Sequence, residues 1–155
     1  MTNPKFETFI YEDLGFPIQL IDVPMQKILG EWVLDINLNE LQVQVLKLLI
    51  QQSTPLQAGE LRFIRKYLEM TTTAFGEIFG VTHAAVLKWE GGQLPSPPMD
   101  VCIRMYVMER IHAKDAEFGK LFHKVNLASL AEAKKNRVRA QPLTLHIKKR
   151  RLAHS

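Results

Sequence analysis

The chain has 155 residues, 46% of them hydrophobic, which is enough to build one domain with appendages or two small domains. No apolar run approaches the length of about 18 residues that a membrane span needs, and Met1 to Ile10 lacks the features of a secretory signal. The single cysteine, Cys102, excludes an intramolecular disulfide, so we expect a protein of the reducing cytoplasm with no membrane partner.

The charge of the chain is unevenly distributed. Residues 1–56 carry a net charge of −4, residues 57–112 are neutral, and residues 113–155 carry +8, which gives +4 in total. A basic tail beside a neutral domain is one sign of a nucleic-acid-binding protein. A tail that is merely solvated explains the same charges equally well, so the inference of nucleic-acid binding needs support from a motif.

The first third of the chain is predicted to begin with a small β-hairpin. Residues 1–15 show no regular pattern, whereas residues 16–23 and 25–36 alternate partly between apolar and polar side chains. We expect two antiparallel strands there, joined near Asp22–Pro24, with a break or bulge at Gly30.

A helix should follow the hairpin. Asn37 and Glu40 have the spacing of a capping box, and apolar residues then recur at helical spacing as far as Gln52. Turn-forming residues at 53–55 end this segment, so the first predicted domain covers residues 1–55.

The second predicted domain covers residues 56–112 and is helical. Its caps, glycines and prolines separate four expected helices, at residues 58–68, 71–79, 82–89 and 97–112. The last helix is apolar around much of its circumference, which suits either a dimer seam or burial within one chain.

The remaining residues, 113–155, form a predicted basic extension. Residues 115–125 and 127–137 have helical composition, and the apolar residues at 143, 145 and 147 alternate like a short strand.

Residues 71–90 have the pattern of two helices that cross around a tight turn. Phe75 and Phe79 supply an apolar inward face, Gly76 permits a close approach, and Gly80 suits the turn. Thr82 can cap the second helix. The inward face of that helix is assigned to Ala85, Val86 and Trp89. Any pair of helices could share part of this pattern, but the full combination favours a helix-turn-helix.

The stretch 58–108 resembles the phage-repressor and Cro class of helix-turn-helix proteins, the XRE class. The resemblance is carried by Leu61, Arg65, Met70, Phe75, Gly80, Val81, Val86, Glu90, Gly92, Pro95 and Ser96. It implies a bundle of four to five helices in which the helix at 82–89 enters the DNA major groove. The predicted fold is therefore mainly α: this bundle, preceded by a small β-hairpin and a helix.

The candidate base-reading residues are His83, Ala84, Leu87 and Lys88, which lie opposite the packed face of the helix at 82–89. Lys88 and His83 can hydrogen-bond to base edges, and the other two can contact a thymine methyl group. No Arg, Asn or Gln is present in this set, so DNA shape is expected to contribute to recognition.

Phosphate contacts are expected at the ends of the helices. Thr72 and Thr82 offer hydroxyl groups at two helix starts. In the class that the chain resembles, the segment after the recognition helix also touches the DNA backbone, which here implies Gly91, Gly92 and Gln93.

Arg65 and Glu90 stand where the same class often pairs an arginine with a glutamate. The resemblance implies an ion pair that positions the recognition helix rather than one that reads DNA.

The N-terminal region is similar to that of a group of antitoxin-type bacterial regulators. The similarity rests on Gly15-Phe16-Pro17, Val23-Pro24-Met25, Gly30-Glu31-Trp32 and Leu61-Arg62-Phe63-Ile64-Arg65. Some of these regulators carry a zinc module built on paired cysteines, which a chain with one cysteine cannot form. The histidines do not cluster either, so we predict no structural metal and no cofactor.

The sequence contains no phosphate-binding glycine loop, nucleophile elbow or metal-spaced histidines, so we do not expect an enzyme. We predict a sequence-specific transcriptional regulator that binds double-stranded DNA, a repressor acting as a homodimer. Two alternatives stay open. One is an autoregulating antitoxin with a toxin protein as partner, and the other is a protein-interaction module that has lost DNA binding.

Overall fold

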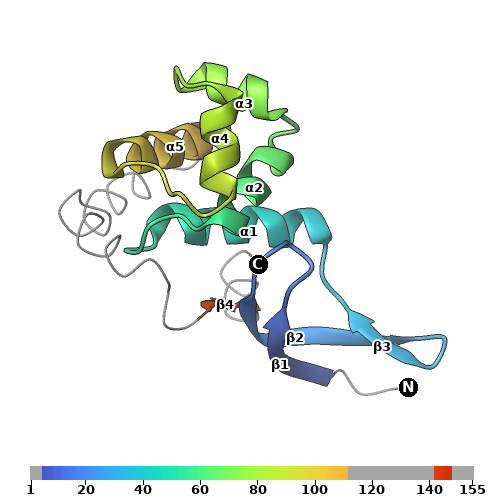
Figure 1. Ribbon diagram of the computed structural model, residues 1–155. Helices are drawn as coiled ribbons and strands as arrows, with labels where there is room; N and C mark the ends of the chain where they lie inside the picture. Colours follow the sequence, from blue (N-terminus) through green and yellow to red (C-terminus); the bar gives the residue numbers. More distant parts are fainter. Residues whose placement is uncertain (1–4, 112–141, 148–155) are drawn as a thin grey trace. The chain divides into compact units, whose positions relative to one another are not determined.

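A computed structural model of the chain describes residues 5–111 and 142–147 (Figure 1). These residues fall into two compact units: one contains residues 5–42 and 142–147, and the other contains residues 43–111. The helices expected at 115–125 and 127–137 lie outside the described residues. None of the helices within the described residues is long and apolar enough to cross a membrane.

The first unit is built on a four-stranded mixed sheet with β2 (Ile18–Ile28) at its centre. β1 (Lys5–Tyr11) and β3 (Glu31–Leu34) pair with β2 antiparallel, and β4 (Leu143–His146) pairs with it parallel. β1 pairs along one edge of β2. Both β3 and β4 therefore pair with the opposite edge, one after the other along β2. The buried side chains of this sheet include Ile18, Leu20, Val23, Leu143 and Leu145.

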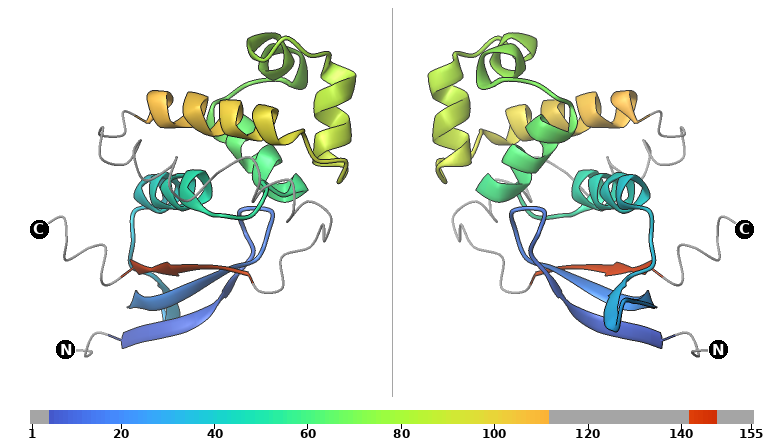
Figure 2. Two further views of the ribbon diagram at one scale, coloured as in Figure 1. Left: turned by 90° about the vertical axis from the view of Figure 1, so that its left-hand side faces the viewer. Right: turned by 90° about the vertical axis from the view of Figure 1, so that its right-hand side faces the viewer.

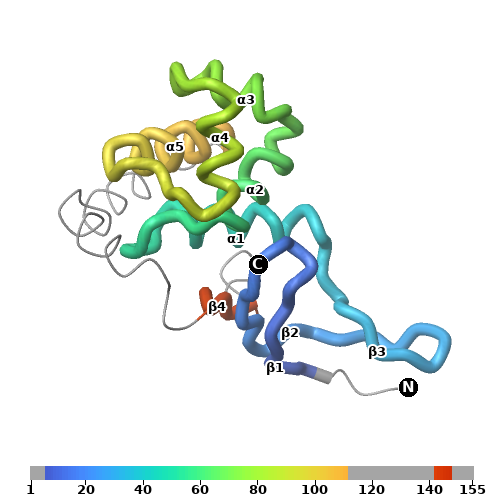
Figure 3. Tube along the Cα trace, in the orientation of Figure 1, coloured from blue at the N-terminus to red at the C-terminus, as the bar shows by residue number. Residues whose placement is uncertain are grey.

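The hairpin turn lies farther along the chain than the sequence suggested. β2 runs unbroken through the expected joint at Asp22–Pro24, where a bulge opposite β1 places Asp22 at a φ of 55°. The chain reverses instead at Leu29 and Gly30, whose φ values of 52° and 86° fit a two-residue type I′ turn. The tube in Figure 3 follows this reversal between β2 and β3.

The prediction of a mainly α chain with a small β-hairpin is therefore wrong, because the described chain is an α/β fold. β1 lies in a segment that looked irregular, since its apolar residues do not alternate cleanly. β4 shows the expected alternation, but its partner strand is distant: Thr144 Oγ1 hydrogen-bonds to Gln19 Oε1 across 125 positions. A pairing between strands so far apart in the chain produces no pattern within a short stretch of the sequence.

The helices follow the sequence prediction within two residues at each end. α1 (Leu38–Gln51) begins in the first unit and ends in the second, and the second unit then contains four more helices. These are α2 (Ala58–Tyr67), α3 (Thr72–Ile78), α4 (His83–Glu90) and α5 (Pro97–Arg110). The expected cap of α1 is confirmed, because the Glu40 amide donates to Asn37 Oδ1 at 3.0 Å.

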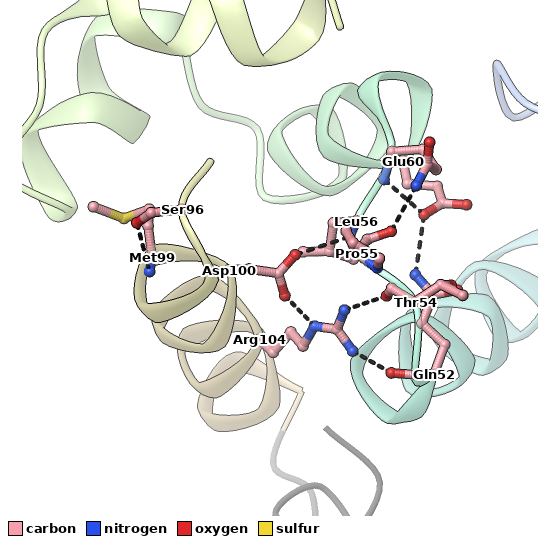
Figure 4. A network of polar contacts seen from close by, with 10 residues as sticks. Gln52, Thr54, Pro55, Leu56, Glu60, Ser96, Met99, Asp100 and Arg104 are labelled. Atoms are coloured by element: carbon pink, nitrogen blue, oxygen red, sulfur yellow. Dashed lines mark hydrogen bonds and ion pairs between the residues drawn. The ribbon is translucent and has the colours of Figure 1, made fainter. Parts of the chain in front are cut away.

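A buried arginine ties the connection between α1 and α2 to α5 (Figure 4). Arg104 is fully buried and donates through Nε to Asp100 Oδ1 at 2.5 Å. Its other two nitrogens donate to the carbonyl oxygens of Gln52 and Thr54, at 2.5 and 2.6 Å. The second oxygen of Asp100 accepts from the Leu56 amide at 2.8 Å. The buried charges and the backbone groups of the connection thus hydrogen-bond to each other.

Replacing Arg104 with methionine should lower the free energy of unfolding by about 3–5 kcal/mol, because the Asp100 carboxylate would stay buried without its partner. Urea denaturation of the full chain measures this loss. Arg110→Met is the matched control, since Arg110 is exposed at the end of the same helix and should change stability by less than about 0.5 kcal/mol. Equal midpoints for the two variants would show that the buried network contributes no stability.

Candidate nucleic-acid interface

α3 and α4 form a tight two-helix unit around a short turn (Figure 2). A Cβ atom placed on Gly76 of α3 would lie 2.6 Å from the carbonyl oxygen of Val81, closer than real Cβ contacts. The backbone also closes this approach, since the Val81 amide donates to the Gly76 carbonyl at 2.9 Å. Gly80 makes the turn with a φ of 69°. The glycine within α3 is thus explained by the close passage of the chain that leads into α4.

Aromatic and apolar side chains hold the two helices against the rest of the unit. The rings of Phe75 and Phe79 meet edge to face at 5.1 Å, and Phe79 meets Tyr106 of α5 at 5.6 Å. On α4, Val86 and Trp89 are buried. One side of α4 is therefore fixed by packing, which determines the side that it exposes.

The exposed side of α4 carries all four candidate base-reading residues: His83, Ala84, Leu87 and Lys88. More than half of the Leu87 surface is accessible, at 53%. Lys88 is the only lysine or arginine among the four. Along the chain, this face therefore presents the polar His83, then the apolar Ala84 and Leu87, and then Lys88.

The two candidate threonines have different positions. Thr82 is exposed and caps α4, with its hydroxyl accepting from the Ala85 amide at 3.2 Å. Thr72 is partly buried as the first residue of α3, and the cap of that helix is its neighbour Thr71. Thr82 therefore lies beside the exposed face of α4 and keeps a hydroxyl proton that it can donate.

The loop after α4 turns its backbone amides inward. The Gly91 and Gln93 amides both donate to the Lys88 carbonyl, at 3.1 and 2.9 Å, and the Gly92 amide donates to the Trp89 carbonyl at 3.2 Å. All three residues are exposed. Their N–H groups complete the last turn of α4, which leaves the Gln93 side chain as the group of this loop best able to reach a phosphate.

A nearly buried carboxylate joins the end of α4 to α2. Arg65 Nε donates to Glu90 Oε2 at 2.7 Å, and Arg65 Nη2 donates to Glu90 Oε1 at 2.9 Å, which makes a two-point pair. The third Arg65 nitrogen donates to the Met70 carbonyl at 3.0 Å. Arg62, which is more exposed, adds a contact to Glu90 Oε1 at 3.2 Å. Sequence reasoning had not given Arg62 a role in this pair.

The surroundings of Glu90 change its acidity. Burial by itself would raise the pKa of this carboxyl group, but the hydrogen bonds and charges of Arg65 and then Arg62 outweigh burial. The pKa of Glu90 therefore lies below its ordinary value of 4.5. Glu90 stays ionised at neutral pH and fixes the direction of α4 relative to α2.

The described part of the second unit has little net charge. Residues 43–111 carry seven basic and six acidic side chains. Within residues 5–111 and 142–147, no three His, Cys, Asp or Glu side chains come together as a group that could hold a metal ion. Among the described residues, the candidate interface thus depends on the side chains of α4 and its neighbours rather than on a broad basic field.

The network of Arg104 and Asp100 is the feature that sequence reasoning missed. The signal was present, because two opposite charges four residues apart lie in a helix that is otherwise largely apolar. Such pairs are common on exposed helix faces, so the spacing could not show that this one is buried against backbone carbonyls.

The close approach of α3 and α4 predicts a destabilised Gly76→Ala variant. Alanine favours a helix by about 1 kcal/mol over glycine, but the added methyl group must displace the Val81 carbonyl. We expect a net loss of about 1–3 kcal/mol in thermal or urea unfolding. Thr73→Ala, on the exposed face of the same helix, should be nearly neutral. A Gly76→Ala protein more stable than the native chain would contradict the tight turn.

The ion pair of Glu90 predicts a pH-dependent loss of stability in Glu90→Gln. At pH 7 the variant should lose about 3 kcal/mol, because Arg65 keeps no charged partner. The folded chain holds the Glu90 proton less tightly than the unfolded chain. The native protein should therefore lose this stabilisation as the pH falls below 4.5, and the two unfolding free energies should converge in acid. A constant difference from pH 7 to pH 3 would show that another group is responsible.

Comparisons with known proteins add no family to this geometry. No protein-family model, no curated protein and no solved structure matches the chain. The resemblance to the phage-repressor class therefore stays a prediction from the sequence, and the function has to be argued from the residues of α3 and α4 themselves.

Proposed function

We propose that α3 and α4 form a helix-turn-helix that binds double-stranded DNA, and that the chain is a transcriptional regulator, a repressor acting as a homodimer. The observation that carries this proposal is the division of α4 into a buried side and an exposed side. The buried side is anchored by Val86, Trp89 and Glu90, and the exposed side presents the base-reading candidates. A major groove about 12 Å wide admits such a helix.

In this arrangement each group has a distinct task. Lys88 donates to a guanine edge or to a phosphate, and Leu87 and Ala84 contact thymine methyl groups. Thr82 and Gln93 donate to phosphates on either side of the groove. The pair of Arg65 and Glu90 holds the angle of α4, so its role is positioning. Two copies would place two such helices on a palindromic site, as single helix-turn-helix units commonly do.

A protein-binding module is the alternative with an observation in its favour. Leu87 is 53% exposed and Ile78 of α3 is 39% exposed, while residues 43–111, the described part of the surrounding unit, are close to neutral. An apolar face with few charges suits a protein partner better than a phosphate backbone. A single measurement of DNA binding distinguishes the two functions.

Fluorescence anisotropy of the full chain, with a labelled duplex from upstream of its own coding sequence and a shuffled duplex, tests the proposal. We expect the upstream duplex to bind at least about 1,000-fold more tightly. Lys88→Ala should weaken this binding by about 5- to 100-fold, the effect of one lost base contact. Arg110→Ala removes the same charge from the end of α5 that lies away from α4 in Figure 2, and should change binding little.

Two results would contradict DNA recognition by α4. Equal and steeply salt-dependent binding to both duplexes would assign the affinity to non-specific charge. No binding to either duplex at low salt would leave the protein-binding module as the function.

A further inference from the structure

The first unit contains a pocket that the proposed DNA-binding function does not use. It has a volume of about 520 Å³, within the usual range for small-ligand sites, and is lined from β1, β2, β3 and the residues after β1. All of its lining residues lie between positions 9 and 34. The pocket is thus a property of the sheet unit by itself.

The strand register explains why aromatic side chains gather in this pocket. Met25 of β2 is opposite Leu34 of β3, and Val23 of β2 is opposite Glu7 of β1, so these residues share one face of the sheet. Alternation along the strands then puts Phe9, Tyr11 and Trp32 on that same face. All three rings line the pocket and are partly accessible.

Two carboxylates complete the lining. Glu12 and Asp13 directly follow β1 and are exposed. The pKa of Tyr11 is raised above its ordinary value, first by burial and then by the negative charge of Asp13, which places that charge near the aromatic wall. Residues 5–42 carry seven carboxylates and two lysines, so the segment that lines the pocket is itself acidic, which favours a cation.

The structure already contains one contact of the kind that such a pocket offers. Lys27 Nζ lies 6.0 Å from the centroid of the Trp32 ring, at the distance of a cation–π interaction. An aromatic wall combined with carboxylates is the arrangement that recognises ammonium and guanidinium groups. A plain metal ion fits less well, because hard cations need several oxygen ligands rather than rings.

We propose that this pocket binds an organic cation, a guanidinium or alkylammonium group, between the rings of Phe9, Tyr11 and Trp32 and the carboxylates of Glu12 and Asp13. The rings contact the flat or alkyl part of the ligand, and the carboxylates accept its N–H groups. The ligand is either a free small molecule or a basic side chain of a partner, since both offer the same chemistry.

The indole resonance of Trp32 gives a direct readout of binding. The chain has two tryptophans, so Trp32→Phe assigns the two indole signals in a nitrogen-15 spectrum of the full protein. Titration with argininamide that is acetylated at its α-amino group, which is the argininamide of all the experiments here, should shift the Trp32 signal to saturation. The equally acetylated citrulline amide, a neutral isostere, should not shift it. No saturable shift, or equal shifts with both compounds, would overturn the proposal.

A pair of double variants tests the carboxylates. Glu12→Gln with Asp13→Asn should weaken argininamide binding by about tenfold or more. Asp22→Asn with Glu31→Gln removes the same charge from exposed residues outside the pocket and should bind as the native chain does. Dispersed spectra confirm that both proteins fold. Equally weakened binding in the two variants would show that net charge alone causes the effect. The proposed site would then be rejected.

The source of the cation follows from one more titration. A capped peptide with a single arginine among alanines is compared with argininamide. If the peptide binds at least about tenfold more tightly, the site serves a basic segment of a partner protein. If the affinities are equal, it serves a free small cation. Both results retain the site, and neither depends on whether α4 binds DNA.

Discussion

The second unit depends on the burial of one guanidinium group. Arg104 has no contact with solvent, and its charge is compatible with the interior only because Asp100 and two backbone carbonyls accept its hydrogens. Those carbonyls belong to the connection between α1 and α2. Without Arg104 they would need hydrogen bonds from water or from the backbone amides of a turn. One side chain on α5 therefore fixes where α2 begins, and α2 in turn carries the arginines that hold α4.

Two of the arginine–carboxylate pairs in the described part of this unit lie at different depths. The pair of Arg104 and Asp100 lies within one helix and satisfies backbone groups in the interior. The pair of Arg65 and Glu90 joins two helices near the surface, with 14% and 3% of their side chains exposed. The first stabilises the unit, and the second sets the orientation of the helix that carries the candidate interface. The two pairs therefore link packing in the core to the placement of α4.

The sequence allowed the helices to be predicted because their signals are local. Asn37, Thr82 and Ser96 cap helices within four residues of the groups they satisfy, and Gly76 and Gly80 mark the turn between α3 and α4. The sheet could not be predicted in the same way. Its fourth strand comes from the other end of the chain, and the aromatic pocket exists only once β2 has placed β1 and β3 on its two edges.

β4 also determines when the chain can finish folding. During synthesis, the described part of the second unit is complete once residue 111 has left the ribosome, whereas the sheet waits for residue 146. Until then the edge of β2 that β4 will occupy offers unpaired N–H and C=O groups to any strand nearby. The first unit thus begins to be synthesised before the second but is completed after it, because β4 comes late in the chain. The nascent chain therefore exposes an unfinished first unit for longer than an unfinished second unit.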